Sequence, residues 1–145
     1  MSGAAAAVLT FAVLVALVTL HEWSVQRQLA SQSVIALRTA VTVEEESVLD
    51  SPSTTGSLQA EANTALSLVA TTEKSTPTLS AITHMTDAYQ TAVSLEIAAV
   101  LRGDPQAASG LHIALGDPAF TTLDAELATV GRAEASNAAD GVTAA

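Results

Sequence analysis

Each of the four prolines in this chain follows a residue that is favoured at the N-cap of a helix. A side-chain oxygen at the N-cap accepts a hydrogen bond from a free backbone N–H, and proline at the first helical position has no N–H to leave unsatisfied. The four pairs therefore predict four helix starts. They are Ser51-Pro52, Thr76-Pro77, Asp104-Pro105 and Asp117-Pro118.

The residues upstream of three of these pairs are typical of helix ends. Lys74 and Arg102 place a cation in a last helical turn, and Gly116 is the residue type favoured just after one. We therefore expect a first helix that runs to Asp50 and a broken fourth helix that pauses at residues 116–118. The expected ranges are about 57–74 for the second helix, 77–102 for the third and 105 to about Asn137 for the fourth, with a frayed tail at 138–145.

The apolar residues between these marks recur every three or four positions, which is the spacing of one buried helix face. No alternating polar and apolar run bounded by hairpin turns occurs, so a sheet is not expected. The pattern predicts an all-α fold with one domain over residues 21–137. The expected core positions are Ala30, Val34, Leu37, Val41 and Val48, interrupted by Glu44, then Leu58, Ala62, Ala65 and Val69, and then Leu79, Ile82, Tyr89, Val93 and Val100.

Residues 3–20 carry no charged side chain over 18 positions. As a helix they measure about 27 Å, close to the thickness of the hydrocarbon core of a bilayer. A secretory signal peptide is the rival interpretation, but Met1-Ser2 lacks a basic residue and no small-residue cleavage pattern follows. We therefore expect a transmembrane helix over residues 1–20, with the lipid bilayer as a partner. Trp23 is placed at the membrane interface, although ordinary packing explains a single Trp equally well.

The charge and the composition exclude several classes of function. Fifteen acidic residues against five basic ones give a net charge of −10, which argues against a nucleic-acid partner because phosphate binding needs clustered Lys and Arg. The chain has no cysteine, so thiolate metal sites and thiol nucleophiles are absent. No G-x-S-x-G motif, glycine-rich phosphate loop or pair of catalytic acids occurs, so we predict no catalytic residues and no enzyme activity in these residues.

No metal site or cofactor is predicted either. His84 and His112 fall on different expected helices, and no Glu-x-x-His or His-x-x-x-His spacing occurs. The run Glu44-Glu45-Glu46 is expected to be solvated, because successive helical residues point about 100° apart and cannot converge on one ion.

Arg38 is the basic residue in the expected bundle that no helix end or exposed face explains. It lies beside the core positions of the first helix, where a guanidinium in a groove between helices can hold a carboxylate ligand through two hydrogen bonds. This hypothesis makes Arg38, Tyr89 and Glu96 the candidate ligand-binding residues. The alternative, which we favour, is an internal ion pair of Arg38 with Glu45 or Glu96.

Two segments carry a resemblance to a known class of proteins. They are AYQTAVSLEIAAVLRGDP at residues 88–105 and GDPAFTTLDAEL at residues 116–127. Together with one span that continues into a long helix, they resemble the extracytoplasmic four-helix sensor region of bacterial transmembrane signalling proteins, which include chemoreceptors, sensor histidine kinases and membrane diguanylate cyclases. The resemblance covers nearly the whole chain, but it rests on architecture and loose patterns rather than on fixed residues.

The resemblance implies an up-down four-helix bundle that acts as a sensor in a homodimer and takes a small-molecule or protein ligand. It also implies a second span and an output domain, which this sequence lacks, so any kinase or cyclase activity would lie outside this chain. The implied location is the bacterial cytoplasmic membrane with the bulk of the chain outside. Arg27 and Arg38 after the span favour the cytoplasm instead, and we follow the resemblance. The alternative function is a single-pass structural or protein-interaction membrane protein.

Overall fold

The computed structural model describes the backbone of residues 2–144 and the side chains of residues 13–18, 25 and 28–137. Every regular element in residues 2–144 is a helix, so the all-α prediction is confirmed. The elements are α1 (Ser2–Ser47), α2 (Pro52–Thr72), α3 (Thr76–Leu101), α4 (Pro105–Leu111), the π-helical turn η1 (His112–Gly116) and α5 (Asp117–Ala144).

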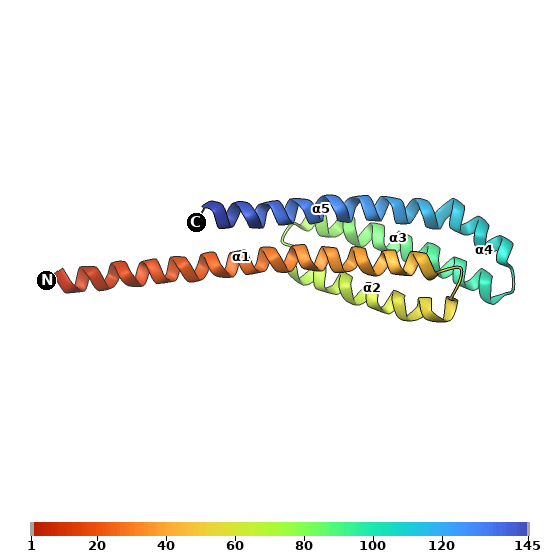
Figure 1. Cartoon of the computed structure of the whole chain (residues 1–145), viewed down its shortest axis with the longest axis horizontal. Coiled ribbons are helices and arrows are strands. Elements are labelled where there is room, and N and C mark those ends of the chain that lie inside the picture. The colour runs from red at the N-terminus through yellow and green to blue at the C-terminus, as the bar shows by residue number, and fades with distance from the viewer. Residues whose placement is uncertain (1, 145) are drawn as a thin grey trace.

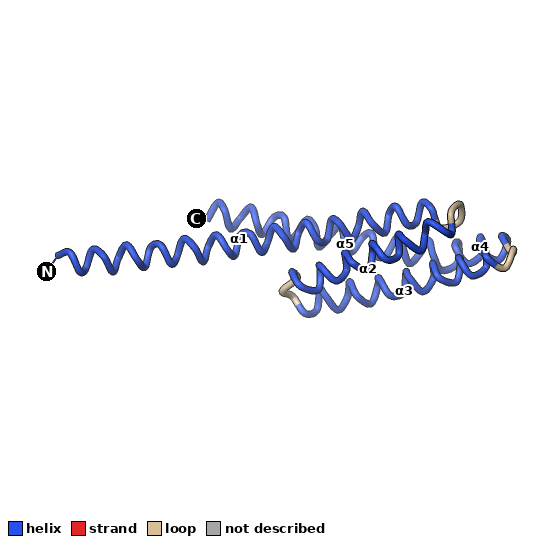
Figure 2. The backbone as a smooth tube through the Cα atoms, turned by 90° about the horizontal axis from the view of Figure 1, so that it is seen from below, coloured by secondary structure: helices blue, strands red, loops and turns tan. Residues whose placement is uncertain are grey.

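The long helices lie side by side (Figures 1 and 2). Helix α1 packs against α2 and α5, and α3 packs against α2, α4 and α5. The first part of α1 and the last part of α5 project beyond the α2–α3 turn in the same direction, so both chain ends lie at the end of the molecule opposite α4 (Figure 1). The molecule therefore has one end formed by α4, η1 and the α1–α2 turn, and another where α1 and α5 extend together.

The expected transmembrane segment lies in the first part of α1. Within residues 3–20 the structure describes the side chains of residues 13–18 only, and Trp23 lies outside the described side chains. A helix needs about 20 consecutive apolar residues to cross a bilayer. Among the residues that the structure describes, no helix combines that length with sufficient apolar character. This finding contradicts the prediction of a membrane span. The predicted location in the bacterial membrane depended on that span and is contradicted with it.

Three of the four proline pairs mark helix starts as predicted. Pro52 lies in the first turn of α2, and Pro105 in that of α4, where the Asp104 side chain accepts a hydrogen bond from the Ala107 N–H at 3.0 Å. In α3 the cap is one residue earlier than predicted, because Ser75, not Thr76, accepts the bond from the Thr78 N–H. The proline pairs therefore mark the starts of these helices to within one residue, whereas the expected range of about 57–74 for the second helix began five residues too late.

The fourth pair, Asp117-Pro118, does not follow a break in the chain. Residues 112–116 form a π-helical turn in which the Asp117 N–H donates to the carbonyl of His112, five residues back. Proline in a helix interior removes one backbone donor, and a π turn lets the helix continue by shifting its hydrogen-bond register. The predicted pause at residues 116–118 is therefore a π turn between α4 and α5 and not a loop.

The core follows the predicted helical stripes. The positions expected in α1 are all buried, as are most of those in α2 and α3, and α5 adds Leu123, Leu127 and Val130. Leu58, Leu79 and Val100 are only partly buried. Burial of one stripe from each long helix is what holds the helices together. The main exception to this apolar interior is a group of polar residues near η1.

Candidate functional site

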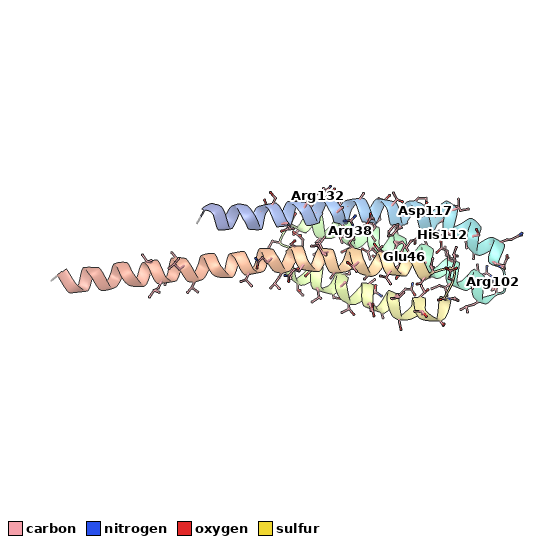
Figure 3. The ribbon with its side chains drawn as sticks, viewed as in Figure 1. Arg38, Glu46, Arg102, His112, Asp117 and Arg132 are labelled. Carbon is pink, nitrogen blue, oxygen red and sulfur yellow. The ribbon has the colours of Figure 1, made fainter. Side chains whose placement is uncertain are left out.

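Seven polar side chains meet where α1, α3 and η1 approach one another, and we call this group the polar cluster. Figure 3 shows His112 and Asp117 at the end of the molecule remote from the two termini, with Glu46 of α1 nearby. The cluster brings together residues from four separate elements of the chain. Its members are Glu44 and Glu45 of α1, Tyr89, Gln90 and Glu96 of α3, His112 of η1 and Asp117 of α5.

The side chain of Glu44, a residue of α1, is fully buried. Its Oε1 accepts a hydrogen bond from Nε2 of Gln90 at 3.0 Å, whereas its Oε2 is buried without a hydrogen-bond partner. Burial disfavours the charged form and raises the pKa of Glu44 to about 7, against the opposing effect of the bond from Gln90. Glu44 is therefore a carboxyl whose charge the fold leaves only partly compensated.

Tyr89 is a fully buried member of the cluster. The centroid of its ring lies 6.0 Å from that of Phe120. Its hydroxyl lies 3.0 Å from Oε2 of Glu45, to which it donates, and 3.4 Å from the carbonyl oxygen of Val41. Burial, followed by the nearby carboxylates, raises the pKa of Tyr89, so the phenol stays neutral and acts as a donor. Tyr89 thus fixes the position of the Glu45 carboxylate.

His112 lies between two carboxylates. Its Nδ1 is 2.9 Å from Oε1 of Glu96, and its Nε2 is 3.3 Å from Oε1 of Glu45. The Glu96 side chain is 0% exposed, and its Oε2 has no hydrogen-bond partner. Burial raises the pKa values of Glu45 and Glu96, while His112 opposes the shift in both. The cluster therefore places His112 between the fully buried Glu96 and the partly buried Glu45.

The π turn is what brings His112 and Asp117 to the cluster together. These residues are five apart, the spacing of one π-turn hydrogen bond, and such turns occur frequently at functional sites. Gly116 is buried inside this turn, and a Cβ built on it would overlap Oε1 of Glu96 and lie 3.0 Å from the Glu96 Cδ. Glycine is needed here because the backbone of η1 passes directly over the Glu96 carboxylate.

Three of these residues lie close enough together to hold a metal ion. Glu45, His112 and Asp117 each offer one ligand atom, and the three atoms lie within 4.8 Å of one another. Carboxylate oxygens and an imidazole nitrogen are ligands that divalent metal ions accept. Glu45 and His112 are partly buried, whereas Asp117 is exposed, so the group opens toward solvent on one side.

The structure brings together two of the three predicted ligand-binding residues. Tyr89 and Glu96 both belong to the polar cluster. Arg38 lies farther toward the chain ends (Figure 3) and pairs with Asp124 of α5, its Nε 2.7 Å from Oδ1 and its Nη2 3.4 Å from Oδ2. The favoured alternative, an internal ion pair of Arg38 with Glu45 or Glu96, is therefore wrong, because the partner is Asp124 and both side chains are partly exposed.

The Arg38–Asp124 pair is expected to contribute little to stability. Its side chains are 46% and 31% exposed, so solvent and salt screen the attraction. Replacing Arg38 with alanine should therefore cause only a small loss in the free energy of unfolding, which disappears at high salt. A double-mutant cycle with Asp124→Asn, followed by urea unfolding at low and high salt, measures the coupling. A large, salt-independent coupling would show that the pair is a structural element.

Sequence reasoning missed the part played by Glu44, Glu45 and His112. The run from Glu44 to Glu46 was expected to be solvated, which is correct for exposed Glu46 and wrong for fully buried Glu44. The available signal was that Glu44 falls on the core stripe between Val41 and Val48. Adjacent helical residues can both face the interior here, because α1 is covered by helices on more than one side.

Comparisons with known proteins identify no relative. No protein-family model, no curated protein and no solved structure matches this chain.

Proposed function

We propose that this chain is a ligand-sensing module of a bacterial signal-transduction receptor, and that it carries out no catalysis itself. In this proposal α1, α2, α3 and the continuous α4–α5 segment form an up-down four-helix bundle, and the polar cluster is its ligand site. The resemblance in residues 88–105 and 116–127 supports the receptor class. The observation that carries the proposal is the incomplete pairing of the buried acids.

Glu44 and Glu96 are both fully buried, and each has an oxygen without a hydrogen-bond partner. Burying a charged group without full compensation costs folding free energy, and buried polar atoms in native proteins are almost always satisfied. Sites that depart from this rule are frequently functional. A ligand that supplies the missing interactions would stabilise the arrangement of α1, α3 and η1 that surrounds it.

The helices that hold the cluster also run to the other end of the molecule. Glu45 belongs to α1 and Asp117 to α5, and these two helices pack against each other and extend together beyond the α2–α3 turn (Figure 1). A change of charge between them would alter their packing, and shifts of about 1–2 Å between helices are a common form of signal. Binding of a ligand at the cluster can thereby change the relative positions of the first part of α1 and the last part of α5.

A distance measurement across these paired ends tests the proposal. Because the chain has no cysteine, the exposed positions Gln28 of α1 and Ser136 of α5 can be changed to cysteine and spin-labelled without background. Replacing Glu44 and Glu96 with glutamine mimics neutralisation of the cluster, and we expect it to shift the label distance by about 1–2 Å.

The control is Glu61→Gln, which makes the same kind of substitution at one exposed position of α2. It should leave the distance unchanged. An identical distance distribution in the double variant and in the parent protein, with folding intact by circular dichroism, would contradict the sensing function. The chain would then be better described as a helical protein-interaction module.

A further inference from the structure

We propose that the polar cluster binds a divalent transition-metal ion of the zinc class, with Glu45, His112 and Asp117 as its ligands and Glu96 as the residue that orients His112. This inference names the ligand class for the sensing site and rests on the proposed function in that respect. It is carried by the contacts of the two ring nitrogens of His112 and by the unpartnered Oε1 of Glu45 that faces Nε2.

The two ring nitrogens of His112 have different roles. Nδ1 lies 2.9 Å from Oε1 of fully buried Glu96, so the ring N–H is placed on this nitrogen and donates to the carboxylate. Nε2 then carries a lone pair. A carboxylate that accepts from one nitrogen of a histidine while the other nitrogen holds the metal is the usual outer-shell arrangement of metal-bound histidines.

Nε2 of His112 faces another electron-rich atom. Oε1 of Glu45 is 3.3 Å away, and it is buried without a hydrogen-bond partner. Two atoms with lone pairs at this separation repel one another unless a cation lies between them. A doubly protonated ring would offer an N–H in that direction, but the contact does not have the geometry of a hydrogen bond. A metal ion between Nε2 of His112 and Oε1 of Glu45 therefore explains this contact better than a proton does.

The separation of these atoms also fits a metal ion. Two ligands that each lie about 2.0–2.1 Å from a tetrahedral zinc ion are about 3.3–3.4 Å apart. The His112–Glu45 contact of 3.3 Å has this length. Asp117 supplies a third ligand atom within 4.8 Å of the others, and its exposed side chain can approach by a change of rotamer. A fourth position remains for water or for an exogenous group.

The surroundings hold these ligands in position. Tyr89 donates to the other oxygen of Glu45 at 3.0 Å, which leaves Oε1 directed at His112. Gly116 allows the η1 backbone to lie against the Glu96 carboxylate. Glu96 also retains an unpartnered, fully buried Oε2 beside the group, so the negative charge near the proposed ion exceeds that of its ligands alone. This charge favours a divalent cation over an anion or a neutral molecule.

Titration of the whole chain with zinc ion alone, followed by isothermal calorimetry, tests the proposal. Cobalt(II) in place of zinc reports the coordination through its visible absorption. We expect one ion per chain that is lost on substitution of His112 by alanine, and an affinity about 10–100-fold weaker in Glu96→Gln, because the outer-shell partner of the histidine is removed. His84→Ala, which removes an exposed histidine of α3, should bind as the parent does.

Asp117→Asn keeps the proposal testable if His112→Ala fails to fold, because Asp117 is exposed and its substitution leaves the core intact. It should lower the zinc affinity at least about tenfold while the melting temperature without metal stays unchanged. Absence of zinc binding by the parent protein would overturn the inference, as would full affinity in both Asp117→Asn and His112→Ala.

The two proposals fail in different ways. Zinc binding without any change in the distance between labels at positions 28 and 136 would leave the metal site in place and contradict the sensing function. A distance change in the Glu44 and Glu96 double variant without zinc binding by the parent would preserve the sensing function and overturn the metal site.

Discussion

Replacing Gly116 with alanine is expected to lower the free energy of unfolding by about 2–3 kcal/mol, as overpacking of a well-packed interior does. The new Cβ would overlap Oε1 of Glu96 and lie 3.3 Å from Nδ1 of His112. Glu96 cannot move away easily because its side chain is fully buried. Relief of the overlap therefore requires the η1 backbone to move, which separates His112 from both of its carboxylate partners.

Gly110→Ala is the matched control for this substitution. Gly110 lies in α4, and a Cβ built there meets no atom within 4 Å. Because alanine favours a helix over glycine, this variant should be more stable than the parent by about 0.5–1 kcal/mol. Urea unfolding followed by circular dichroism measures both variants. Equal effects of the two substitutions would show that the close contact between η1 and Glu96 does not exist.

The second large effect is a loss of stability as the pH rises through neutrality. The pKa of Glu44 is about 7 in the folded protein and 4.5 as its ordinary value. Between these values the folded state binds a proton that the unfolded state releases, so the free energy of unfolding falls as the pH rises. The stabilisation is fully present below about pH 4.5 and is lost above about pH 7, with an amplitude of about 3 kcal/mol.

Glu44→Gln should remove most of this dependence. The glutamine carbonyl can still accept the hydrogen bond from Gln90, and no charge has to be buried at high pH. The variant should therefore be more stable than the parent at about pH 8 and nearly equal to it at about pH 4.5. Glu45 and Glu96 also have raised pKa values, so a shallower dependence in the same direction should remain.

Urea unfolding at a series of pH values, in the presence of a chelator to exclude metal binding, measures this difference. Glu61→Gln, at an exposed position of α2, is the control and should give a curve parallel to that of the parent. Parallel curves for Glu44→Gln and the parent would show that Glu44 does not titrate between its ordinary pKa and neutrality.

The ligand-binding residues predicted from the sequence were only partly brought together. Tyr89 could be placed in the core from its position on a helical stripe, and Glu96 from its position one turn beyond Val93. The partner of Arg38 could not be predicted, because Asp124 lies 86 residues away along the chain. Which pairs of helices become neighbours depends on how all the stripes pack together, and this is a property of the whole chain.

The sequence by itself determined the class of the fold, the starts of α2, α3 and α4 and most of the buried stripes. These features depend on local chemistry: a capping side chain next to a proline, and apolar residues at helical spacing. The tertiary structure decided that Asp117-Pro118 continues a helix through a π turn. It also decided that Glu44, Glu45, Glu96 and His112 share one buried site. Contacts between distant segments make these choices, because these side chains are shielded from water only when the helices pack together.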